Sequence, residues 1–388
     1  MKKVLAILLA CTLGCFVGCG DNTKDPVDTN NYTFSSFTNP TLVLTGTSDY
    51  KDEVADPSIV KGDDGYFYIF ATNQVVLRSQ DACNWEFYKR GLFPTPSWSG
   101  DPELYPNDPG GCAIWAPDVI KIGDKWIYYY SLSGWGKCCG IGLAVADEIA
   151  GPYTDLGKLF SYKQIGIENA IDPHVFVDYD GRVYMSVGSF QGLYIVELTA
   201  DGLGLMGGLE TQKNEKILIA GKVGGWDGST YEGSYIIEKD GYYYYFGSVG
   251  SCCEGKNSTY RVVCGRSESI TGPYLDSKGF NMTMSGNGVT VGEPVLNTGF
   301  NNPNYAGAGH NSILKDDAGD YWIYYHAYSA KDNFRTRHLF MNKLFWTEDG
   351  WPYVENNVVD NETGESELQK YKPSFDEELD GPRFLVKE

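Results

Sequence analysis

The segment Asp56-Pro57-Ser58-Ile59-Val60, with the turn residue Gly65 and the aromatic run Tyr66-Phe67-Tyr68-Ile69-Phe70 after it, sets the pattern of the whole chain. Its order is a first position, a small residue, an apolar run, a turn glycine and an aromatic run. The same order recurs four more times, at intervals of about 60 to 80 residues. The further copies begin at the first positions Ala116, Asp172, Glu232 and His310.

Repeats of this length, built from short aromatic strands, are typical of propeller blades, which bury their faces only against neighbouring blades. The composition agrees, because 29 Tyr and 47 Gly among 388 residues suit strands and turns better than helices. We therefore predict an all-β chain that forms a five-bladed β-propeller over residues 41–388. In such a ring the first position of each repeat lies near the axis.

Four of the five first positions carry a polar side chain: Asp56, Asp172, Glu232 and His310, with Ala116 as the fifth. If the repeats superpose, three carboxylates and an imidazole meet in one central funnel. Like charges in a buried site raise one another's pKa, which is a property of functional sites. The alternative is that Asp-Pro and Asp-Gly pairs merely begin turns; it would account for one such pair more readily than for four in register.

The first residues have the features of an export signal. A basic start, Met1-Lys2-Lys3, precedes the apolar run 4–17, which is too short for a stable membrane-spanning helix. The following Phe16-Val17-Gly18-Cys19 resembles a bacterial lipobox, with Cys11 and Cys15 as alternative lipidation sites. We therefore predict a lipoprotein signal peptide over residues 1–19, lipidation of Cys19, export to the outer membrane and a flexible tether over residues 20–40.

The net charge of −20 argues against nucleic acid and anionic membrane surfaces as partners, whereas a neutral sugar is compatible with it. We expect a monomer that contacts a membrane only through the lipid on Cys19.

The segment 202–207 matches the dinucleotide fingerprint literally, but it falls in a loop between blades without a parallel unit around it. No organic cofactor is therefore expected. The seven cysteines after Cys19 cannot all pair with one another, and the sequence leaves their pairing open.

At this level of detail the repeats resemble a known family. The segments that resemble the signatures of glycoside hydrolase family 43 are Asp56-Pro57-Ser58-Ile59-Val60, Trp115-Ala116-Pro117-Asp118-Val119, Ala170-Ile171-Asp172-Pro173 and Glu232-Gly233-Ser234. Further segments are similar to endo-1,5-α-L-arabinanases: Gly250-Ser251-Cys252-Cys253-Glu254-Gly255, Asn257-Ser258-Thr259-Tyr260, Gly309-His310-Asn311-Ser312 and Tyr325-His326-Ala327-Tyr328. One departure is Ala55, because many arabinanases carry His before the first catalytic Asp.

The resemblance implies an inverting hydrolase of α-1,5-L-arabinofuranosidic bonds in arabinan. It implies that Asp56 is the general base, Glu232 the general acid and Asp172 the group that holds up the pKa of the acid. The chemistry agrees, because inversion needs one carboxylic acid to protonate the leaving oxygen and one carboxylate to activate water. A neighbouring anion at Asp172 would disfavour ionisation of the acid.

The remaining site residues follow from the same resemblance and from the chemistry of sugars. Arabinanases of this type hold a metal ion, usually assigned as Ca²⁺, near the residue that corresponds to His310, with water completing the shell; alternatively, His310 is a buried hydrogen-bonding residue. Apolar sugar faces suit aromatic platforms, for which Trp115 and Phe190 are the candidates, although core packing is an equal alternative for both. Arg337 aligns with a basic residue of the family that could bind the sugar.

Three functions stay open on the sequence. The first is an arabinan endo-hydrolase. The second is an exo-acting α-L-arabinofuranosidase or β-xylosidase of the same family, with the same three carboxylates. The third is a glycan-binding propeller without catalysis, which the intact Asp56, Asp172 and Glu232 disfavour, because a binding module needs no buried acid.

Overall fold

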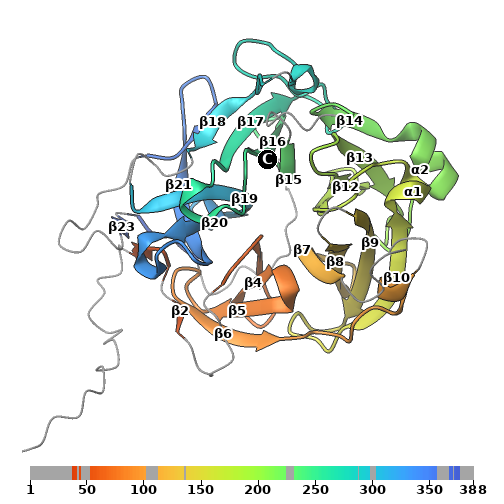
Figure 1. The fold of residues 1–388 in the computed structure, drawn as a ribbon, viewed down its shortest axis with the longest axis horizontal. Helices are drawn as coiled ribbons and strands as arrows, with labels where there is room; N and C mark the ends of the chain where they lie inside the picture. The colour runs from red at the N-terminus through yellow and green to blue at the C-terminus, as the bar shows by residue number, and fades with distance from the viewer. Residues whose placement is uncertain are drawn as a thin grey trace, which may run out of the picture. The chain divides into compact units, whose positions relative to one another are not determined.

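The structure is a computed structural model, which describes residues 37–41, 43–44, 53–101, 112–134, 137–223, 231–286, 288–297, 303–355, 367–369 and 371–375. The described residues all belong to one compact unit, Phe34–Glu388. The predicted signal peptide and Cys19 lie outside the described residues. The prediction of an all-β chain with five blades is confirmed, since five sheets surround one axis (Figure 1).

Each blade contains four antiparallel strands that follow one another outward from the axis, and blade 1 has one further strand at its outer edge. Blade 1 contains β3 (Ser58–Lys61), β4 (Phe67–Ala71), β5 (Val75–Ser79) and β6 (Trp85–Arg90), with β2 (Val43–Leu44) parallel to β6 at its edge. Blade 2 contains β7 (Ala113–Ile122), β8 (Lys125–Gly134), β9 (Lys137–Ala146) and β10 (Thr154–Ser161). Blade 3 contains β11 (His174–Val177), β12 (Val183–Val187), β13 (Leu193–Leu198) and β14 (Ile217–Ala220).

The last two blades follow the same order. Blade 4 contains β15 (Tyr231–Lys239), β16 (Tyr242–Val249), β17 (Arg261–Ser267) and β18 (Glu293–Leu296). Blade 5 contains β19 (Tyr305–Lys315), β20 (Tyr321–Ser329), β21 (Arg337–Trp346) and β22 (Pro352–Tyr353). The helices of the described residues are short and lie between strands: α1 (Tyr162–Ile165), α2 (Leu209–Glu215), η2 (Thr72–Gln74), η3 (Ser97–Gly100), η4 (Gly255–Asn257), η5 (Met282–Met284) and η6 (Ala330–Asp332).

The hydrophobic core lies between neighbouring blades. Among the described residues there are five apolar clusters, and each joins the facing sheets of two adjacent blades. The second strand β8 shows why the aromatic runs are continuous rather than alternating. Its Tyr128 and Tyr130 pack toward blade 1, whereas Ile127 and Tyr129 pack toward blade 3. Successive side chains of a strand point to opposite faces, so a strand with a blade on either side needs apolar residues throughout.

A ring of inter-blade hydrogen bonds surrounds the axis one layer away from the first positions. It crosses all five interfaces between blades, and its members are Ile59 N–H to Ser312 Oγ (3.1 Å), Ser58 Oγ to Asp118 Oδ1 (2.8 Å), Val175 N–H to Asp118 Oδ2 (2.8 Å), His174 Nε2 to Ile236 O (3.2 Å) and Tyr235 OH to Ile313 O (3.0 Å). Asp118 is buried and joins blade 2 to both of its neighbours. Its carboxylate is therefore a structural link between blades, with His174 Nδ1 3.2 Å away.

The N-terminal boundary of the propeller differs from the prediction. Residues 37–39 were assigned to the flexible tether, but they form β1 (Phe37–Asn39), which pairs with β23 (Glu367–Gln369). Asn39 is buried, donates to Met341 O (2.7 Å) and accepts from Met341 N–H (3.0 Å) of blade 5. The assignment failed because a polar segment was interpreted as unstructured, whereas its Asn pairs with backbone groups of the last blade.

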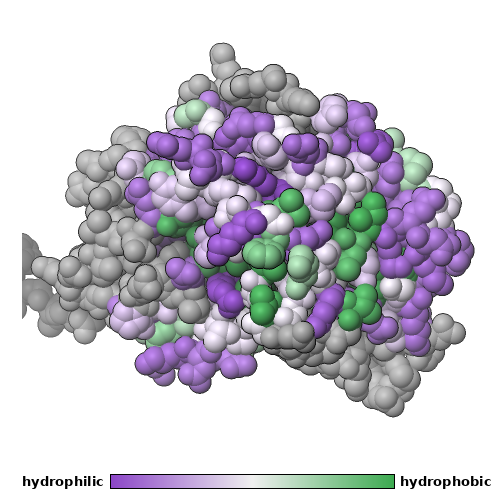
Figure 2. Space-filling view, turned by 90° about the horizontal axis from the view of Figure 1, so that it is seen from above, coloured by the Kyte–Doolittle hydropathy of each residue, from purple (hydrophilic) through white to green (hydrophobic). Residues whose placement is uncertain are grey.

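Hydrophobic side chains gather on one face of the unit between hydrophilic flanks (Figure 2). Val223, Met284 and Val289 are among the exposed large apolar side chains of the described residues. β14 and η5 approach one another, since Gly221 N–H donates to Met282 O (3.1 Å). None of the helices in the described part of the chain is long and apolar enough to span a membrane.

Candidate active site

The innermost strand region of every blade has a residue in the left-handed backbone conformation at an equivalent place, and β19 contains Gly307 (φ 68°) as a second one. The equivalent residues are Asp56 (φ 56°), Ala116 (φ 34°), Asp172 (φ 59°), Gly233 (φ 57°) and His310 (φ 50°). A non-glycine residue with positive φ is uncommon, so four of them in equivalent places indicate a functional constraint on the backbone. The first positions predicted from the sequence are therefore equivalent in four blades. In blade 4 the equivalent residue is Gly233 rather than Glu232.

Strand pairing explains this shift of one residue. Glu232 pairs with Ser248 just before a bulge, as Trp115 pairs with Ser131 in blade 2. Glu232 is therefore the counterpart of Trp115. Glu232, the predicted general acid, therefore stands one position before the left-handed residue of its blade, Gly233. Asp56, the predicted general base, is itself the left-handed residue of blade 1.

The backbone N–H groups of the left-handed residues donate to side chains on the neighbouring blade. The bonds are Ala116 N–H to Thr72 Oγ1 (2.9 Å), Asp172 N–H to Ser131 Oγ (2.9 Å), His310 N–H to Ser248 Oγ (2.8 Å) and Asp56 N–H to His326 Nδ1 (3.1 Å). We call these four bonds the axial ring. They fix the backbone that presents the first positions to the axis.

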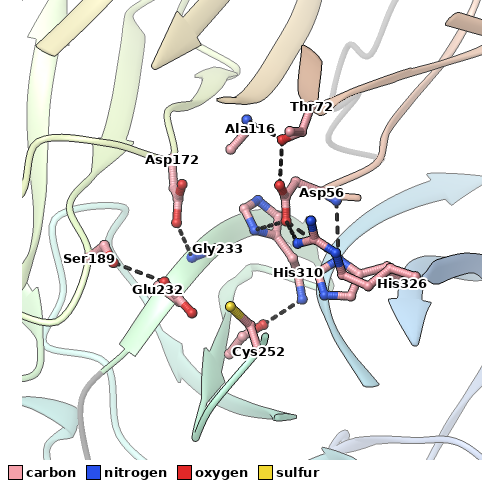
Figure 3. Close-up of polar contacts among 12 residues, drawn as sticks. Asp56, Thr72, Ala116, Asp172, Ser189, Glu232, Gly233, Cys252, His310 and His326 are labelled. Carbon is pink, nitrogen blue, oxygen red and sulfur yellow. Dashed lines mark hydrogen bonds and ion pairs between the residues drawn. The ribbon is translucent and has the colours of Figure 1, made fainter. Parts of the chain in front are cut away.

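The axial ring changes at blade 3, next to the predicted general acid. Gly188 of blade 3 is the counterpart of Thr72 of blade 1. The N–H of Gly188 donates to the residue before Asp172, just as the N–H of Thr72 donates to the residue before Asp56. Gly188 has no side chain to accept the N–H of Gly233. That N–H donates to Asp172 Oδ2 instead, at 3.1 Å. The missing side chain thus turns the Asp172 carboxylate toward the strand that carries Glu232 (Figure 3).

Asp56 is held as an anion. Its Oδ1 lies 3.1 Å from His310 Nδ1, 3.4 Å from His326 Nδ1 and 3.9 Å from Arg337 Nη1, and Thr72 Oγ1 donates to its Oδ2. Burial alone would raise the pKa of Asp56. The charge and hydrogen bond of His310, with the charges of Arg337 and His326, outweigh burial and lower the pKa far below its usual range. A carboxylate ionised at neutral pH can accept a proton from water.

Glu232 has the opposite protonation. Burial, followed by the negative charge of Asp172, raises its pKa from 4.5 to about 7. Its Oε2 accepts a hydrogen bond from Ser189 Oγ at 3.0 Å, and Tyr260 and His310 partly oppose the rise in pKa. Glu232 therefore keeps its proton in weakly acidic solution and can donate it.

Asp172 lies between these two extremes. Burial raises its pKa from 3.8 to about 6, and the charge of Asp56 adds to the rise, whereas His310 and the Gly233 N–H oppose it. Asp172 therefore loses its proton before Glu232 does. The resulting anion is what keeps Glu232 protonated, as in other pairs of close carboxyl groups.

The two histidines beside Asp56 differ in charge. Burial alone would lower the pKa of His310, but Asp56 and Asp172 raise it to about 9, so this imidazole is protonated at neutral pH. Burial lowers the pKa of His326 well below its usual value, so it is neutral. Since His326 Nδ1 accepts the N–H of Asp56, its proton is on Nε2.

The propeller and its axial carboxylates agree with the protein family that this chain matches. The model of the family described as glycosyl hydrolases family 43 matches residues 50–352, which is most of the chain and includes strands of all five blades. The chain belongs to glycosyl hydrolases family 43. The match confirms the family resemblance of the sequence and makes the protein a glycoside hydrolase.

Named relatives of this family 43 chain include both exo- and endo-acting enzymes. It is 33% identical to the extracellular exo-α-(1→5)-L-arabinofuranosidase ArbA of Cellvibrio japonicus, over 80% of this chain and 88% of that protein. It is 34% identical to the extracellular endo-α-(1→5)-L-arabinanase 1 of Bacillus subtilis, over 76% of this chain and 86% of that protein. The solved α-L-arabinanase of Cellvibrio cellulosa complexed with arabinohexaose superposes with a TM-score of 0.67 at 32% identity, covering 78% of this chain and 95% of that chain.

The predicted substrate contacts of this family 43 site occupy different surroundings. Arg337 lies in the site, where its guanidinium pairs with Glu53 Oε1 (3.1 Å) and approaches Asp56. The half-buried Trp115 is at the strand position of Glu232 in its own blade. Phe190 follows Ser189, and its N–H donates to Tyr231 O (2.9 Å), next to the predicted acid. Contact of these three side chains with a sugar stays a prediction.

The loop after β16 carries a disulfide between adjacent residues, Cys252 and Cys253, a pairing that the sequence left open. Cys252 points to the same space as Glu232 and His310 in Figure 3. Cys253 Sγ lies 4.0 Å from Arg337 Nη1. The disulfide is therefore part of the wall of the site. Four other cysteines, Cys83, Cys112, Cys139 and Cys264, form no disulfide within the described residues.

Several site residues were given no role by the sequence reasoning, although Tyr260 and His326 lie in segments that resemble arabinanases. These site residues are Glu53, Thr72, Ser131, Ser189, Ser248, Tyr260 and His326. A signal for four of them exists, because Thr72, Ser131, Ser248 and His326 are each the first polar residue after the aromatic run of a repeat. Glu53 and Tyr260 lie in segments between repeats, where the pattern gives no such signal.

Proposed function

We propose that this protein is an arabinan hydrolase that cleaves α-1,5-L-arabinofuranosidic bonds with inversion, in the interior of the chain. One observation carries the proposal. In weakly acidic solution Asp56 is ionised while Glu232 keeps its proton in the same axial site, which is the division of roles that inverting hydrolysis requires. The choice of arabinan is supported by the relatives that are named for α-(1→5)-L-arabinan chemistry.

The proposed reaction assigns a step to each carboxyl group. Glu232 gives its proton to the glycosidic oxygen, and the bond from this oxygen to the anomeric carbon breaks. Asp56 takes a proton from water as the water oxygen bonds to the opposite face of that carbon. Glu232 ends ionised and Asp56 protonated, and exchange with solvent restores both. Asp172 holds the proton on Glu232 beforehand, and Arg337 with Trp115 and Phe190 would hold the sugars.

The experiment is digestion of linear 1,5-α-L-arabinan with analysis of product lengths over time. The proposal expects oligosaccharides of several lengths from the start. The second candidate is an exo-acting α-L-arabinofuranosidase, favoured by the 33% identity to an exo-acting relative; it would release one short product from the outset. Activity on xylo-oligosaccharides alone would favour the β-xylosidase alternative, and binding without any hydrolysis would favour the non-catalytic propeller.

A calcium ion on the axis is part of the proposal as a separate component. His310 Nδ1 faces Asp56, so only its Nε2 could face an ion, and the protonated imidazole would first have to release its Nε2 proton. The described residues contain no group of three His, Cys, Asp or Glu side chains suited to a metal. They therefore fit a hydrated ion held by one nitrogen and do not fit a cage of protein ligands. Such an ion would supply positive charge beside Asp56. Calorimetric titration with CaCl₂ of the parent and of His310→Ala tests this, and equal binding would exclude the site.

The proposed cellular location is the outer membrane, through a lipid on Cys19 at the end of the signal peptide. The names of the relatives, which include the word extracellular, support export. The polypeptide itself would be a monomer. Metabolic labelling with a fatty acid, in the parent and in Cys19→Ala, measures the anchor, and equal labelling of both would exclude lipidation of Cys19.

A further inference from the structure

Thr72 joins the axial ring to the carboxylate of Asp56. It lies at the start of η2, directly after β4 of blade 1, and is half-buried. Its hydroxyl has two partners, the backbone N–H of Ala116 in blade 2 (2.9 Å) and Oδ2 of Asp56 (Figure 3). Ser131 and Ser248 occupy the same place in their blades and take the N–H of the next blade, but Thr72 is the hydroxyl of these three that also contacts a carboxylate.

The direction of both bonds follows from the atoms involved. A hydroxyl has one proton and two lone pairs. The Ala116 N–H can only donate, so Thr72 Oγ1 accepts there. An ionised carboxylate can only accept, so the single hydroxyl proton of Thr72 must point at Asp56 Oδ2. The backbone of blade 2 thus sets the orientation of the hydroxyl, and the hydroxyl sets the rotation of the carboxylate.

The other oxygen of Asp56 is held from the opposite side. Oδ1 faces His310 Nδ1 (3.1 Å) and Arg337 Nη1 (3.9 Å). Without Thr72, these two cations on one oxygen would leave the carboxylate free to rotate about its last bond. General-base catalysis depends on the position of the accepting lone pair, and a displacement of about 1 Å can cost about 100-fold in rate.

We propose that Thr72 is a positioning residue for the general base, which fixes Asp56 Oδ2 so that this carboxylate meets the attacking water in one orientation. Thr72 exchanges no proton with water or sugar. The inference rests on the proposed role of Asp56. It extends that role to a residue outside the repeated motif, one that couples the base to the interface between blades 1 and 2.

The test compares Thr72→Val, which keeps the shape but loses the hydroxyl, with Thr72→Ser, which keeps the hydroxyl. Thr72→Val should lower kcat on linear arabinan by about 100-fold and change KM by less than about twofold. Thr72→Ser should restore kcat to within about threefold of the parent. The matched control is Ser312→Ala, which loses a hydrogen bond between blades 5 and 1 away from the carboxylates. It should lower Tm as Thr72→Val does and keep kcat.

Each outcome decides the point. A parent-like kcat in Thr72→Val, an equal loss of kcat in Ser312→Ala, or a failure of Thr72→Ser to restore kcat would overturn the positioning role. Asp56→Asn separates this from the proposed function. If Asp56→Asn keeps the parent kcat, the base assignment itself is wrong. If Asp56→Asn is inactive and Thr72→Val is fully active, only the inference about Thr72 fails.

Discussion

Replacing Asp172 by Asn should move the alkaline limb of the pH profile toward lower pH. The pKa of Glu232 is raised to about 7, first by burial and second by the negative charge of Asp172. Asparagine keeps an oxygen for the N–H of Gly233 and removes the charge. The Glu232 proton is then less strongly held, and the pKa should fall by about one unit, which corresponds to about 1.4 kcal/mol.

The size of the effect on rate depends on pH. In the proposed reaction Glu232 acts in its protonated form, so activity should be present below its pKa and be lost as the pH rises through it. With a pKa of about 7 half of the enzyme is competent at pH 7, and with a pKa of about 6 roughly one molecule in eleven is. Asp172→Asn should therefore lose about fivefold at pH 7 and little at pH 5 through this cause.

The assay is kcat/KM on linear arabinan from pH 4 to pH 9, for the parent, Asp172→Asn and Asp118→Asn. Asp118 is a buried carboxylate of the structural ring, and Asp118→Asn should leave the limb where it is in the parent. A loss of kcat/KM that is the same at every pH lowers the whole profile without moving its alkaline limb. The pH at which this limb falls is therefore the criterion. A limb that stays in place or rises in Asp172→Asn would refute the reasoning.

Two further predictions concern the rest of the described structure. Asp118→Asn should lower the free energy of unfolding by about 2 kcal/mol, because it weakens charge-assisted bonds to Ser58 and Val175, and urea denaturation measures this; unchanged stability would contradict the link between blades. Reduction of the disulfide between Cys252 and Cys253 with a phosphine should expose two more thiols and raise KM about threefold, because the wall of the site beside Arg337 loosens. A variant with Ser at both positions should not respond to the phosphine. Equal responses of the parent and this variant would exclude the disulfide as the cause.

The ring of blades could be predicted from the sequence because its signal is repeated. Each aromatic run is buried on both faces, as the neighbours Ile127 and Tyr128 of β8 show by packing toward different blades. Such runs differ from the alternating pattern of a one-sided sheet, and five of them define five sheets. The end of the tether could not be found in this way, because Asn39 is tied in by bonds to the backbone of blade 5 rather than by an apolar pattern.

The residues of the axial site could be predicted from the sequence, but their alignment between blades could not. Asp56, Asp172, Glu232 and His310 were selected as first positions, and the structure brings all four to the axis. The alignment of Glu232 with the others was off by one residue, because a bulge is a feature of the backbone that strand pairing reveals and spacing does not. Thr72 was missed for a related reason, since its importance comes from the neighbouring blade.

The most direct test of the account is the kinetics of Glu232→Gln on two substrates, linear arabinan and an aryl α-L-arabinofuranoside with a good leaving group. Glutamine cannot donate a proton to the glycosidic oxygen. The account predicts that kcat/KM on arabinan falls by about 1,000-fold, whereas the aryl substrate, which needs no proton on its leaving oxygen, loses less than about tenfold. Parent-like hydrolysis of arabinan by Glu232→Gln would contradict the assignment of Glu232 as the acid.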